Sequence, residues 1–519
     1  FGIDTGGTEK SRLGAIETST PSVLSRPGPP LWYAYGLASD RALADQFMSA
    51  QAERVPLIMF GSKDGMIHAI KNDPLQIDLA SNGEEAWAYV PAKVAGGMVP
   101  DYTASLGGEV SVSAYPDGSP TLSDVKIGGV FHTVALVAGG NGSKSVVALD
   151  VTETVDLDTG NVVGPTPLWH GTPGEGDAGQ AFAKPAVARV LIDGAERFAS
   201  ITATGIAFDN VVSPFLKGRI VSAYDIADGH LLWQFKARCP ITSDITTFET
   251  DDPDEPGAPS INGYADRAVF ADACGYVYKV DPNKDLAGGW NGNAGLGDLL
   301  IDDLDGTELY ALFSTASTTG ALAAESPIVG TLAARVDSTS RVVLFFGTGG
   351  LESHDPNLPN EFYGVYADTG EIRSKLVGAC GANGCEKFYG GVVVTPDSVI
   401  LTRAVDPRVG TGTCDPGSAT LEVVSLDANA DGDFEGEYVQ AVSSSVMGPL
   451  YGDADALYFA TLAGDLVRVG EPRAPEAGDD ARAGYFATNH FGQGGETGAS
   501  SGLIGTTEPM TFLGWRQVY

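Results

Sequence analysis

The sequence predicts an all-β chain folded as a modified seven-bladed β-propeller, with loop insertions and minor helical decoration. The 519 residues include 68 glycines and 30 prolines, and such frequent turn-forming residues favour many short strands over long helices. A hairpin of two short strands around a Gly/Asp/Asn turn recurs about seven times. Two further strand patterns, one led by a proline and one rich in aromatic residues, recur beside these hairpins.

The recurring patterns together make a four-stranded antiparallel repeat. The hairpins occupy residues 55–70, 132–151, 197–226, 266–281, 341–372, 397–428 and 455–470. Proline-led strands begin near residues 18, 117, 182 and 324, and aromatic closing strands lie at 83–87, 164–169 and 229–233. A spacing of roughly 45 to 85 residues suits propeller blades with inserted loops. A pair of β-sandwiches would also contain hairpins, but the threefold recurrence of leading strand, hairpin and closing strand favours a single propeller domain over residues 1–519.

One helix is predicted, at residues 39–53. The segment SDRALADQFMSAQAE is rich in alanine and amphipathic, and Ser39 is placed to cap its N-terminus. We expect it to decorate a blade.

The charge balance restricts the partners of the chain. There are 31 basic and 67 acidic residues, a net charge of −36, so the molecule repels nucleic acid and anionic lipid surfaces. No apolar run approaches the roughly 20 residues of a spanning helix, so we expect no direct membrane insertion. Clustered carboxylates attract Ca²⁺, although an acidic surface can also serve solubility alone.

Five cysteines fit an exported protein with one or two disulfides. We expect Cys380 to pair with Cys385. The odd count leaves at least one thiol that is free or bonded to another molecule.

An acidic loop at residues 427–435 has the spacing of an EF-hand calcium loop. In DANADGDFEGE, oxygen-bearing side chains alternate around a turn that Gly432 relieves. The strand-like sequences LEVVSL and EYVQAV flank this loop, so we expect it inside a hairpin and not between two helices. A solvated acidic turn is the alternative. The candidate Ca²⁺ ligands are Asp427, Asn429, Asp431, the carbonyl of Asp433, and Glu435.

A second acidic loop, TDDPDEPGAPSINGYADRAVFAD, runs from Thr250 to Asp272. Its carboxylates Asp251, Asp252 and Asp254 are separated by a Pro/Gly-containing insertion from Asn262, Tyr264 and Asp266. From spacing alone, a calcium site and a solvated loop are equally favoured.

No catalytic motif is evident, and we expect the chain not to be an enzyme. None of the six histidines has the HxxxH or HExxH spacing of a metal site, and no GxSxG elbow is present. The GGNGSK segment at 139–144 joins two strands and is predicted to be a hairpin turn, not a phosphate loop.

One segment supports an enzymatic alternative. AYDIADGHLLW, from Ala223 to Trp233, resembles the AxDxxxGxxxW repeat of pyrroloquinoline-quinone dehydrogenases. Such enzymes commonly carry a vicinal cysteine pair, and this chain has no adjacent cysteines. We therefore interpret the repeat as blade architecture, in which the Trp packs between blades and the Gly turns the outer strand.

Several motifs in chain order resemble the PilY-type type IV pilus biogenesis proteins and tip-associated adhesins. They include LGAIETSTPSVL, GSKDGMIHAI, WAYVPA, the stretch YPDGSPTLSDVKIGGVFHTVALVAGGNGSKSVVALDVT, AYDIADGHLLW, YADRAVFADACGYVYKVD and FLGWRQVY. The resemblance covers essentially the whole chain, and the stretch from Asp117 to Thr152 is the most specific part together with GSKDGMIHA.

The resemblance implies a calcium-binding protein of the type IV pilus tip. It would be exported to the pilus tip, cell surface or outer membrane, bind minor pilins, and support pilus assembly, extension and retraction control, surface adhesion and twitching motility. Its receptor is unknown, and the chain would be the C-terminal part of a longer protein. The alternatives are a quinoprotein dehydrogenase-like propeller and a non-adhesive scaffold in an envelope complex.

The resemblance also places a family calcium site in the second acidic loop. The implied ligands are Asp251, Asn262, the carbonyl of Tyr264, and Asp266. The insertion after Asp251 departs from the compact family loop, so either Asp252 or Asp254 substitutes as a ligand or the site is lost.

Overall fold

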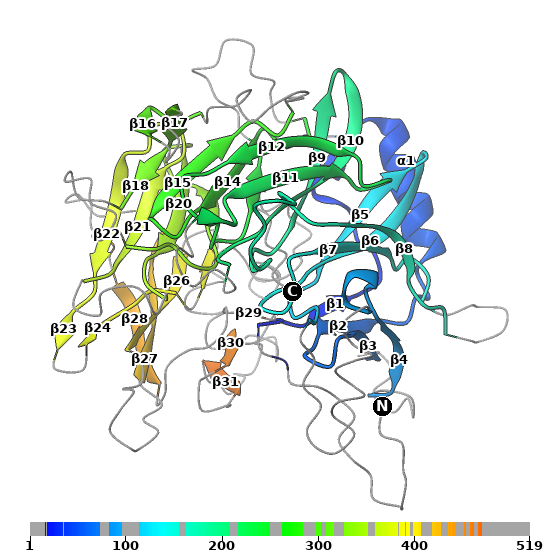
Figure 1. Cartoon of the computed structure of the whole chain (residues 1–519), viewed down its shortest axis with the longest axis horizontal. Helices are drawn as coiled ribbons and strands as arrows, with labels where there is room; N and C mark the ends of the chain where they lie inside the picture. The colour runs from blue at the N-terminus through cyan, green and yellow to red at the C-terminus, as the bar shows by residue number, and fades with distance from the viewer. Residues whose placement is uncertain are drawn as a thin grey trace, which may run out of the picture. The chain divides into compact units, whose positions relative to one another are not determined.

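The computed structural model describes residues 16, 18–34, 36–72, 83–95, 114–154, 162–207, 216–249, 262–283, 296–302, 308–315, 326–350, 359–381, 384–389, 391–394, 398–405, 418–426, 434, 436–442, 451–452, 457–460 and 466–469. Within these residues the chain is almost entirely β-structure (Figure 1).

Seven antiparallel sheets carry most of the regular structure in the described ranges. Six have four strands and the last has three. The first three sheets are β1 (Ser22–Leu24), β2 (Leu57–Gly61), β3 (Ile67–Lys71) and β4 (Glu85–Tyr89); β5 (Thr121–Ile127), β6 (Val130–Ala138), β7 (Val146–Asp150) and β8 (Thr166–Gly171); and β9 (Ala186–Ile192), β10 (Ala195–Ala203), β11 (Ile220–Asp225) and β12 (Leu231–Lys236).

The remaining four sheets follow in chain order. They are β13 (Thr246–Phe248), β14 (Arg267–Ala271), β15 (Tyr276–Val280) and β18 (Phe313–Ser314); β19 (Ala333–Val336), β20 (Val342–Gly347), β21 (Glu361–Tyr366) and β22 (Ile372–Val377); β25 (Val392–Val394), β26 (Ser398–Val405), β27 (Ser418–Ser425) and β28 (Gly436–Val442); and β29 (Tyr451–Gly452), β30 (Leu457–Ala460) and β31 (Leu466–Val469). Two small hairpins are added, β16 (Leu299–Asp302) with β17 (Glu308–Ala311), and β23 (Cys380–Gly381) with β24 (Gly384–Cys385).

The predicted hairpins are the central strands of these sheets. Each of the seven forms the second and third strands of one sheet, or the last two strands of the three-stranded sheet, from β2–β3 through to β30–β31. The closing strands become β4, β8 and β12, and the first three proline-led segments become β1, β5 and β9. This arrangement confirms the predicted all-β, seven-bladed fold class. The fourth proline-led segment differs: it forms isolated bridges, from Ile328 to Thr348 and from Gly330 to Ser243, and β19 begins at Ala333.

The chain divides into two compact units. Unit 1 comprises Phe1–Lys236, Asn262–Tyr264 and Asn283–Gly292, and it contains β1 to β12. Unit 2 comprises Ala237–Ile261, Ala265–Pro282 and Asn293–Tyr519, and it contains β13 to β31. The expectation of one domain over residues 1–519 stays a prediction.

Each unit has its own apolar core between neighbouring sheets. In unit 1, Met59 and Ile67 of the first sheet pack with Ala135 and Leu149 of the second. In unit 2, aromatic residues dominate, and Phe313 lies edge-on to Tyr363 with ring centroids 5.1 Å apart. Burial of both faces of the sheets explains why the central strands are almost continuously apolar in sequence.

Tight turns between the second and third strands set the register of two hairpins. Gly65 and Gly275 have φ of +94° and +84°, a backbone conformation that side chains with a Cβ rarely adopt. In both turns the N–H of the glycine donates to the backbone carbonyl of the residue three positions earlier, which is Ser62 for Gly65 and Asp272 for Gly275. The GGNGSK segment likewise joins β6 to β7 as a turn, as predicted.

The AxDxxxGxxxW segment forms part of the third sheet, and its glycine lies at the turn between β11 and β12, as predicted. Asp225 accepts the N–H of Ala227 on Oδ1 at 2.9 Å, and Gly229 closes the turn with φ of +74°. Trp233, the tryptophan of the repeat, is buried in β12, and its packing between blades stays a prediction. A different tryptophan, Trp169 of β8, lies against Gly229 and donates its indole N–H to the carbonyl of Ile226 at 2.9 Å. A Cβ at position 229 would lie 2.7 Å from that indole ring, so the glycine is required for this contact.

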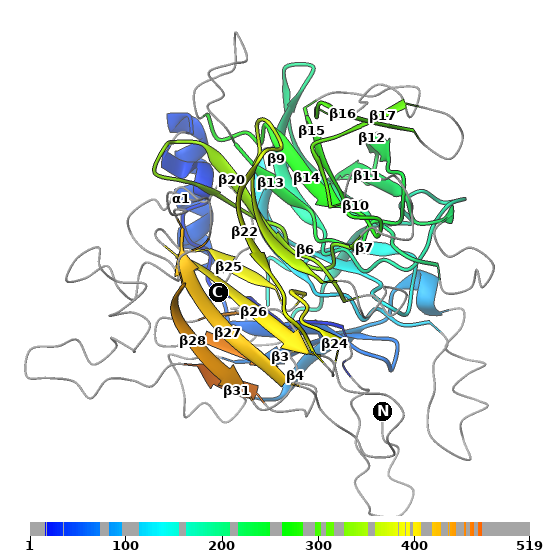
Figure 2. The same cartoon turned by 90° about the vertical axis from the view of Figure 1, so that its left-hand side faces the viewer.

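The helix forms where the sequence predicts it, but its cap differs. Helix α1 spans Ala38–Ala50, and Leu37 is its N-cap without a side-chain hydrogen bond. The prediction that Ser39 caps the helix is therefore wrong, because the helix begins one residue earlier and Ser39 lies in its first turn. Phe47 of α1 packs beside Phe131 of β6 with ring centroids 6.0 Å apart, and Figure 2 shows the helix from a second side.

Two disulfides are present in unit 2. Cys380 pairs with Cys385, as predicted, and Cys239 pairs with Cys274. Cys414, the fifth cysteine, lies outside the described residues.

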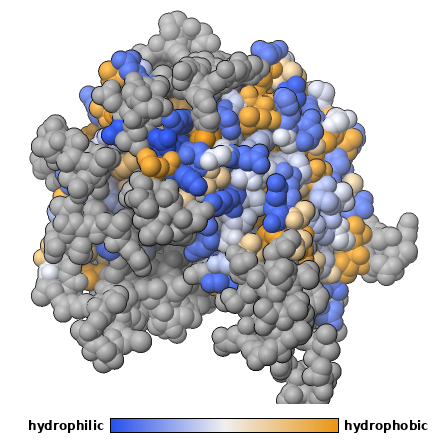
Figure 3. Space-filling view, in the orientation of Figure 1, coloured by the Kyte–Doolittle hydropathy of each residue, from blue (hydrophilic) through white to orange (hydrophobic). Residues whose placement is uncertain are grey.

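The surface shown in Figure 3 mixes polar and apolar residues in small groups. Single exposed apolar side chains, such as Leu191 and Ile372, are ordinary for a folded domain. No helix in the described part of the chain is long and apolar enough to cross a membrane.

Candidate calcium sites

The loop predicted to bind Ca²⁺ at residues 427–435 closes a hairpin, as expected. Strands β27 and β28 pair antiparallel, and Val424 lies opposite Gly436 next to a bulge. The flanking elements are therefore strands and not the helices of an EF-hand. The five candidate ligands themselves, Asp427, Asn429, Asp431, Asp433 and Glu435, lie outside the described residues.

The base of this hairpin loop is held firmly in unit 2. Leu426, just before the loop, and Phe434, near its end, are both buried in one apolar cluster. The Phe434 ring packs on Phe362 with centroids 5.5 Å apart. Arg373 of β22 donates from Nη1 to the carbonyl of Leu426 at 2.7 Å. Fixing both ends of a loop lowers the ordering cost that ligand binding would otherwise carry.

The residue that follows the third strand, here Leu426, has a counterpart that is held in the same way in two other sheets. In each case a side chain from the preceding sheet donates a hydrogen bond to the carbonyl of the first residue after the third strand. The pairs are Trp169 to Ile226 at 2.9 Å, Lys279 to Ala367 at 2.6 Å, and Arg373 to Leu426 at 2.7 Å. The acidic loop thus occupies the place where the third and fifth sheets carry short turns around Gly229 and Gly370. Sequence reasoning missed this contact because its donors are three different residue types.

The second acidic loop is described only at its C-terminal end. Asp251 and Asp254 lie outside the described residues, whereas Asn262, Tyr264 and Asp266 lie within them. Asn262 Oδ1 accepts the N–H of Tyr264 at 2.9 Å, which forms a turn with Gly263 at φ of +84°.

Asp266 lies where the second loop leads into β14. Its side chain is buried, and its N–H donates to the carbonyl of Phe248 at 3.0 Å. Asn262 and Tyr264 belong to unit 1 and Asp266 to unit 2. Calcium binding by these residues therefore stays a prediction.

A buried ion cluster in unit 1 fixes Tyr264. Its ring centroid lies 4.3 Å from the guanidinium carbon of Arg189, and the ring of Trp32 lies 4.4 Å from the same carbon. Arg189 also donates to Asp40 at 2.8 Å and to Glu196 at 3.2 Å. A guanidinium that contacts two aromatic rings and pairs with two carboxylates is held rigidly. The contact with Arg189 therefore holds Tyr264, at the end of the second loop, against β9.

Lys126 of β5 completes this cluster. Its Nζ donates to Asp40 at 3.1 Å and to Glu196 at 2.9 Å. Burial lowers the pKa of Lys126, but the hydrogen bonds to the two carboxylates raise it more, so the ammonium stays charged. The carboxylates of Asp40 and Glu196 are thus neutralised by protein cations and are poor candidates for metal ligands.

His68 lies in a triad-like arrangement that offers no accessible nucleophile. Its Nδ1 contacts Glu85 at 2.6 Å, its Nε2 contacts Asp64 at 3.0 Å, and Ser62 lies 3.3 Å from Nε2. Burial lowers the pKa of His68, whereas the hydrogen bonds with Asp64 and Glu85 raise it above its usual value. Because Ser62 is fully buried, we interpret the set as a structural brace across the GSKDGMIHAI hairpin.

Within the described ranges, no group of three or more His, Cys, Asp or Glu side chains is arranged to hold a metal ion. Both acidic loops extend beyond those ranges. The structure shows how the described ends of these loops are held, at Leu426 and Phe434 for the first loop and at Tyr264 and Asp266 for the second.

Comparison with known proteins finds similarity to type IV pilus biogenesis factors. No family model matches it. Over 184 residues it is 30% identical to the type IV pilus biogenesis factor PilY1 of Pseudomonas aeruginosa, an alignment that covers 35% of this chain and 14% of that protein. A PilY1 homologue of Xylella fastidiosa is 26% identical over 527 aligned positions, covering 96% of this chain and 32% of the homologue.

The crystal structure of the C-terminal domain of Pseudomonas aeruginosa PilY1 has the same fold. It superposes with a TM-score of 0.53 and 17% identity, covering 84% of this chain and 96% of that domain. The chain is similar to PilY-type proteins in sequence, and its fold is that of the PilY1 C-terminal domain. In these sequence alignments it spans between 14% and 32% of the length of its curated PilY1 relatives.

Proposed function

We propose that this PilY-type chain acts in type IV pilus biogenesis as a calcium-binding propeller at the pilus tip. Its relatives carry the name of type IV pilus biogenesis factors, and its fold is that of a PilY1 C-terminal domain. The observation that carries the calcium part of the proposal is the anchored β27–β28 hairpin, which presents an EF-hand-like ligand spacing on a fixed base. In this proposal the domain binds minor pilins and supports adhesion, extension and retraction control, and twitching motility.

A non-catalytic role is part of this proposal. The triad-like set at His68 contains a buried serine, and the AxDxxxGxxxW segment is used for contacts between sheets. An absorption scan of the purified protein, together with a dye-linked alcohol oxidation assay, tests this point. We expect neither a quinone band nor turnover, and a bound quinone would contradict the proposal.

A gene replacement in the organism that encodes this chain tests the pilus role. We expect deletion of the region encoding these residues to reduce surface pili and twitching zones, and an Asp427→Ala, Asp431→Ala replacement to alter twitching while the protein level stays unchanged. Normal piliation and twitching in the deletion strain would contradict the role. A matched Asp298→Ala strain, changed at an exposed aspartate of unit 2, controls for loss of charge.

A further inference from the structure

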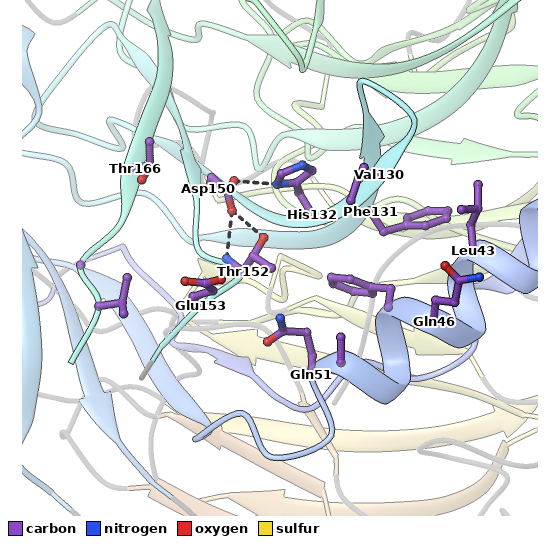
Figure 4. A pocket seen from close by; sticks show the side chains of 14 residues that line it. Leu43, Gln46, Gln51, Val130, Phe131, His132, Asp150, Thr152, Glu153 and Thr166 are labelled. Atoms are coloured by element: carbon purple, nitrogen blue, oxygen red, sulfur yellow. Dashed lines mark hydrogen bonds and ion pairs between the residues drawn. The ribbon is translucent and has the colours of Figure 1, made fainter. Parts of the chain in front are cut away.

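Unit 1 contains a cavity of about 470 Å³ between helix α1 and the second sheet. Figure 4 shows side chains of α1 facing side chains at the start of β6 and the end of β7 across this space. Its volume lies within the range of ligand pockets in proteins. None of the predicted calcium ligands lines it.

One wall of this cavity is apolar. Leu43 and Phe47 of α1 line it together with Val130 and Phe131 of β6, and the rings of Phe47 and Phe131 pack with centroids 6.0 Å apart. Phe47 and Phe131 are buried, but Val130, the large apolar side chain that begins β6, is 61% exposed. The wall can therefore cover an aliphatic chain with little rearrangement of the protein.

The opposite side of the cavity is acidic. Asp150 at the end of β7 contacts His132 at 2.8 Å and accepts the hydroxyl of Thr152 at 2.6 Å, as the dashed lines in Figure 4 show. Glu153 is exposed at the rim, and Gln46 of α1 adds an amide. Among the described residues that line the cavity, none is lysine or arginine.

We propose that this cavity binds the side chain of a lysine or arginine presented by a partner protein. The aliphatic stem would lie on the apolar wall, and the charged end would meet Glu153 and the carboxylate of Asp150. This division matches the two parts of a long basic side chain. The net charge of −36 attracts such a partner over longer distances. The proposal does not depend on the pilus role, because it rests on the cavity alone.

Saturation-transfer NMR with a minimal probe tests the proposal. The probe is Nα-acetyl-lysine N-methylamide, compared with the matching norleucine and glutamate derivatives, added to the full chain at low ionic strength. We expect the lysine derivative to bind with a dissociation constant on the order of millimolar, as a single side chain does. If the norleucine derivative binds as tightly as the lysine derivative, the cavity recognises only the apolar part of the probe. If the glutamate derivative binds more tightly than the lysine derivative, the cavity prefers an anion. Either result overturns the proposal.

Charge reversal at the rim gives a matched pair of variants. We expect Glu153→Lys to weaken binding of the lysine derivative at least fivefold, because an attractive charge becomes repulsive. Glu175→Lys, at an exposed position of unit 1 outside the cavity lining, should leave the affinity unchanged. Unchanged affinity in Glu153→Lys, or equal losses in both variants, would show that general surface charge and not this cavity attracts the probe.

Discussion

Replacing Asp272 with alanine should lower the free energy of unfolding of unit 2 by about 3 to 5 kcal/mol. This carboxylate is fully buried. It accepts four hydrogen bonds within 3.1 Å, from the N–H groups of Cys239, Cys274 and Tyr276 and from the hydroxyl of Tyr278. Truncation would remove the Asp272 acceptor from all four donors, and a buried donor that loses its acceptor costs on the order of 1 to 3 kcal/mol.

Equilibrium denaturation in guanidinium chloride measures this loss. The matched control is Asp298→Ala, at an exposed aspartate of unit 2, which should change stability by less than about 0.5 kcal/mol. A loss below about 1 kcal/mol in Asp272→Ala would mean that water replaces the carboxylate. In that case the four-donor cluster would not stabilise the hairpin turn.

Asp272 should also make stability depend on pH. Burial raises the pKa of Asp272 from 3.8 to about 7, although its four donors favour the charged form. Between pH 3.8 and about 7, Asp272 is protonated in the folded state and ionised in the unfolded state. Protonation of Asp272 therefore stabilises the folded state, fully below about pH 4, and this stabilisation is lost as the pH rises through about 7. Relative to Asp272→Asn, the wild type should lose on the order of 3 kcal/mol between pH 4.5 and 7.5 in urea denaturation. Parallel profiles for the two proteins would contradict this assignment.

Removal of the Cys239–Cys274 disulfide should have the second large effect on stability. The bridge closes a loop with a sequence separation of 35, and the chain-entropy model gives about 3 to 4 kcal/mol for a loop of this length. Both cysteines are buried and both donate their N–H groups to Asp272. We therefore expect the double alanine variant to unfold at a markedly lower denaturant concentration.

The other disulfide provides the control for this experiment. Cys380 and Cys385 are only five residues apart, so replacing both with alanine should cost about 2 kcal/mol or less by the same model. Equal losses in the two double variants would contradict the loop-length argument. The triple variant with Asp272→Ala and both cysteine replacements should lose less free energy of unfolding than the sum of the two separate losses, because all three residues belong to one cluster.

The repeated hairpins could be predicted because their signal is local. The turn around Gly65 and the apolar strands β2 and β3 beside it lie within 16 residues of sequence, and so do the turn at Gly275 and its two strands. The β27–β28 hairpin around the acidic loop was predictable for the same reason. Periodicity and turn chemistry carry such information without reference to distant residues.

The contacts that hold these hairpins together could not be predicted, because they join distant segments. Arg189 looks like an ordinary strand residue until Trp32 and Tyr264 enclose it. Asp272 resembles any turn aspartate, and its partner Cys239 lies 33 residues away. Disulfide connectivity over such a distance does not follow from spacing.

Titration calorimetry of the chelator-treated protein with Ca²⁺ tests the central claim most directly, repeated on the Asp427→Ala, Asp431→Ala variant. The proposal predicts that the wild type binds Ca²⁺ and that the variant loses this binding, because two alternating ligands of one anchored loop are removed. Binding that survives in the variant would assign Ca²⁺ to the loop ending at Asp266. An absence of Ca²⁺ binding to the wild-type chain would contradict the proposal and make both acidic loops solvated turns.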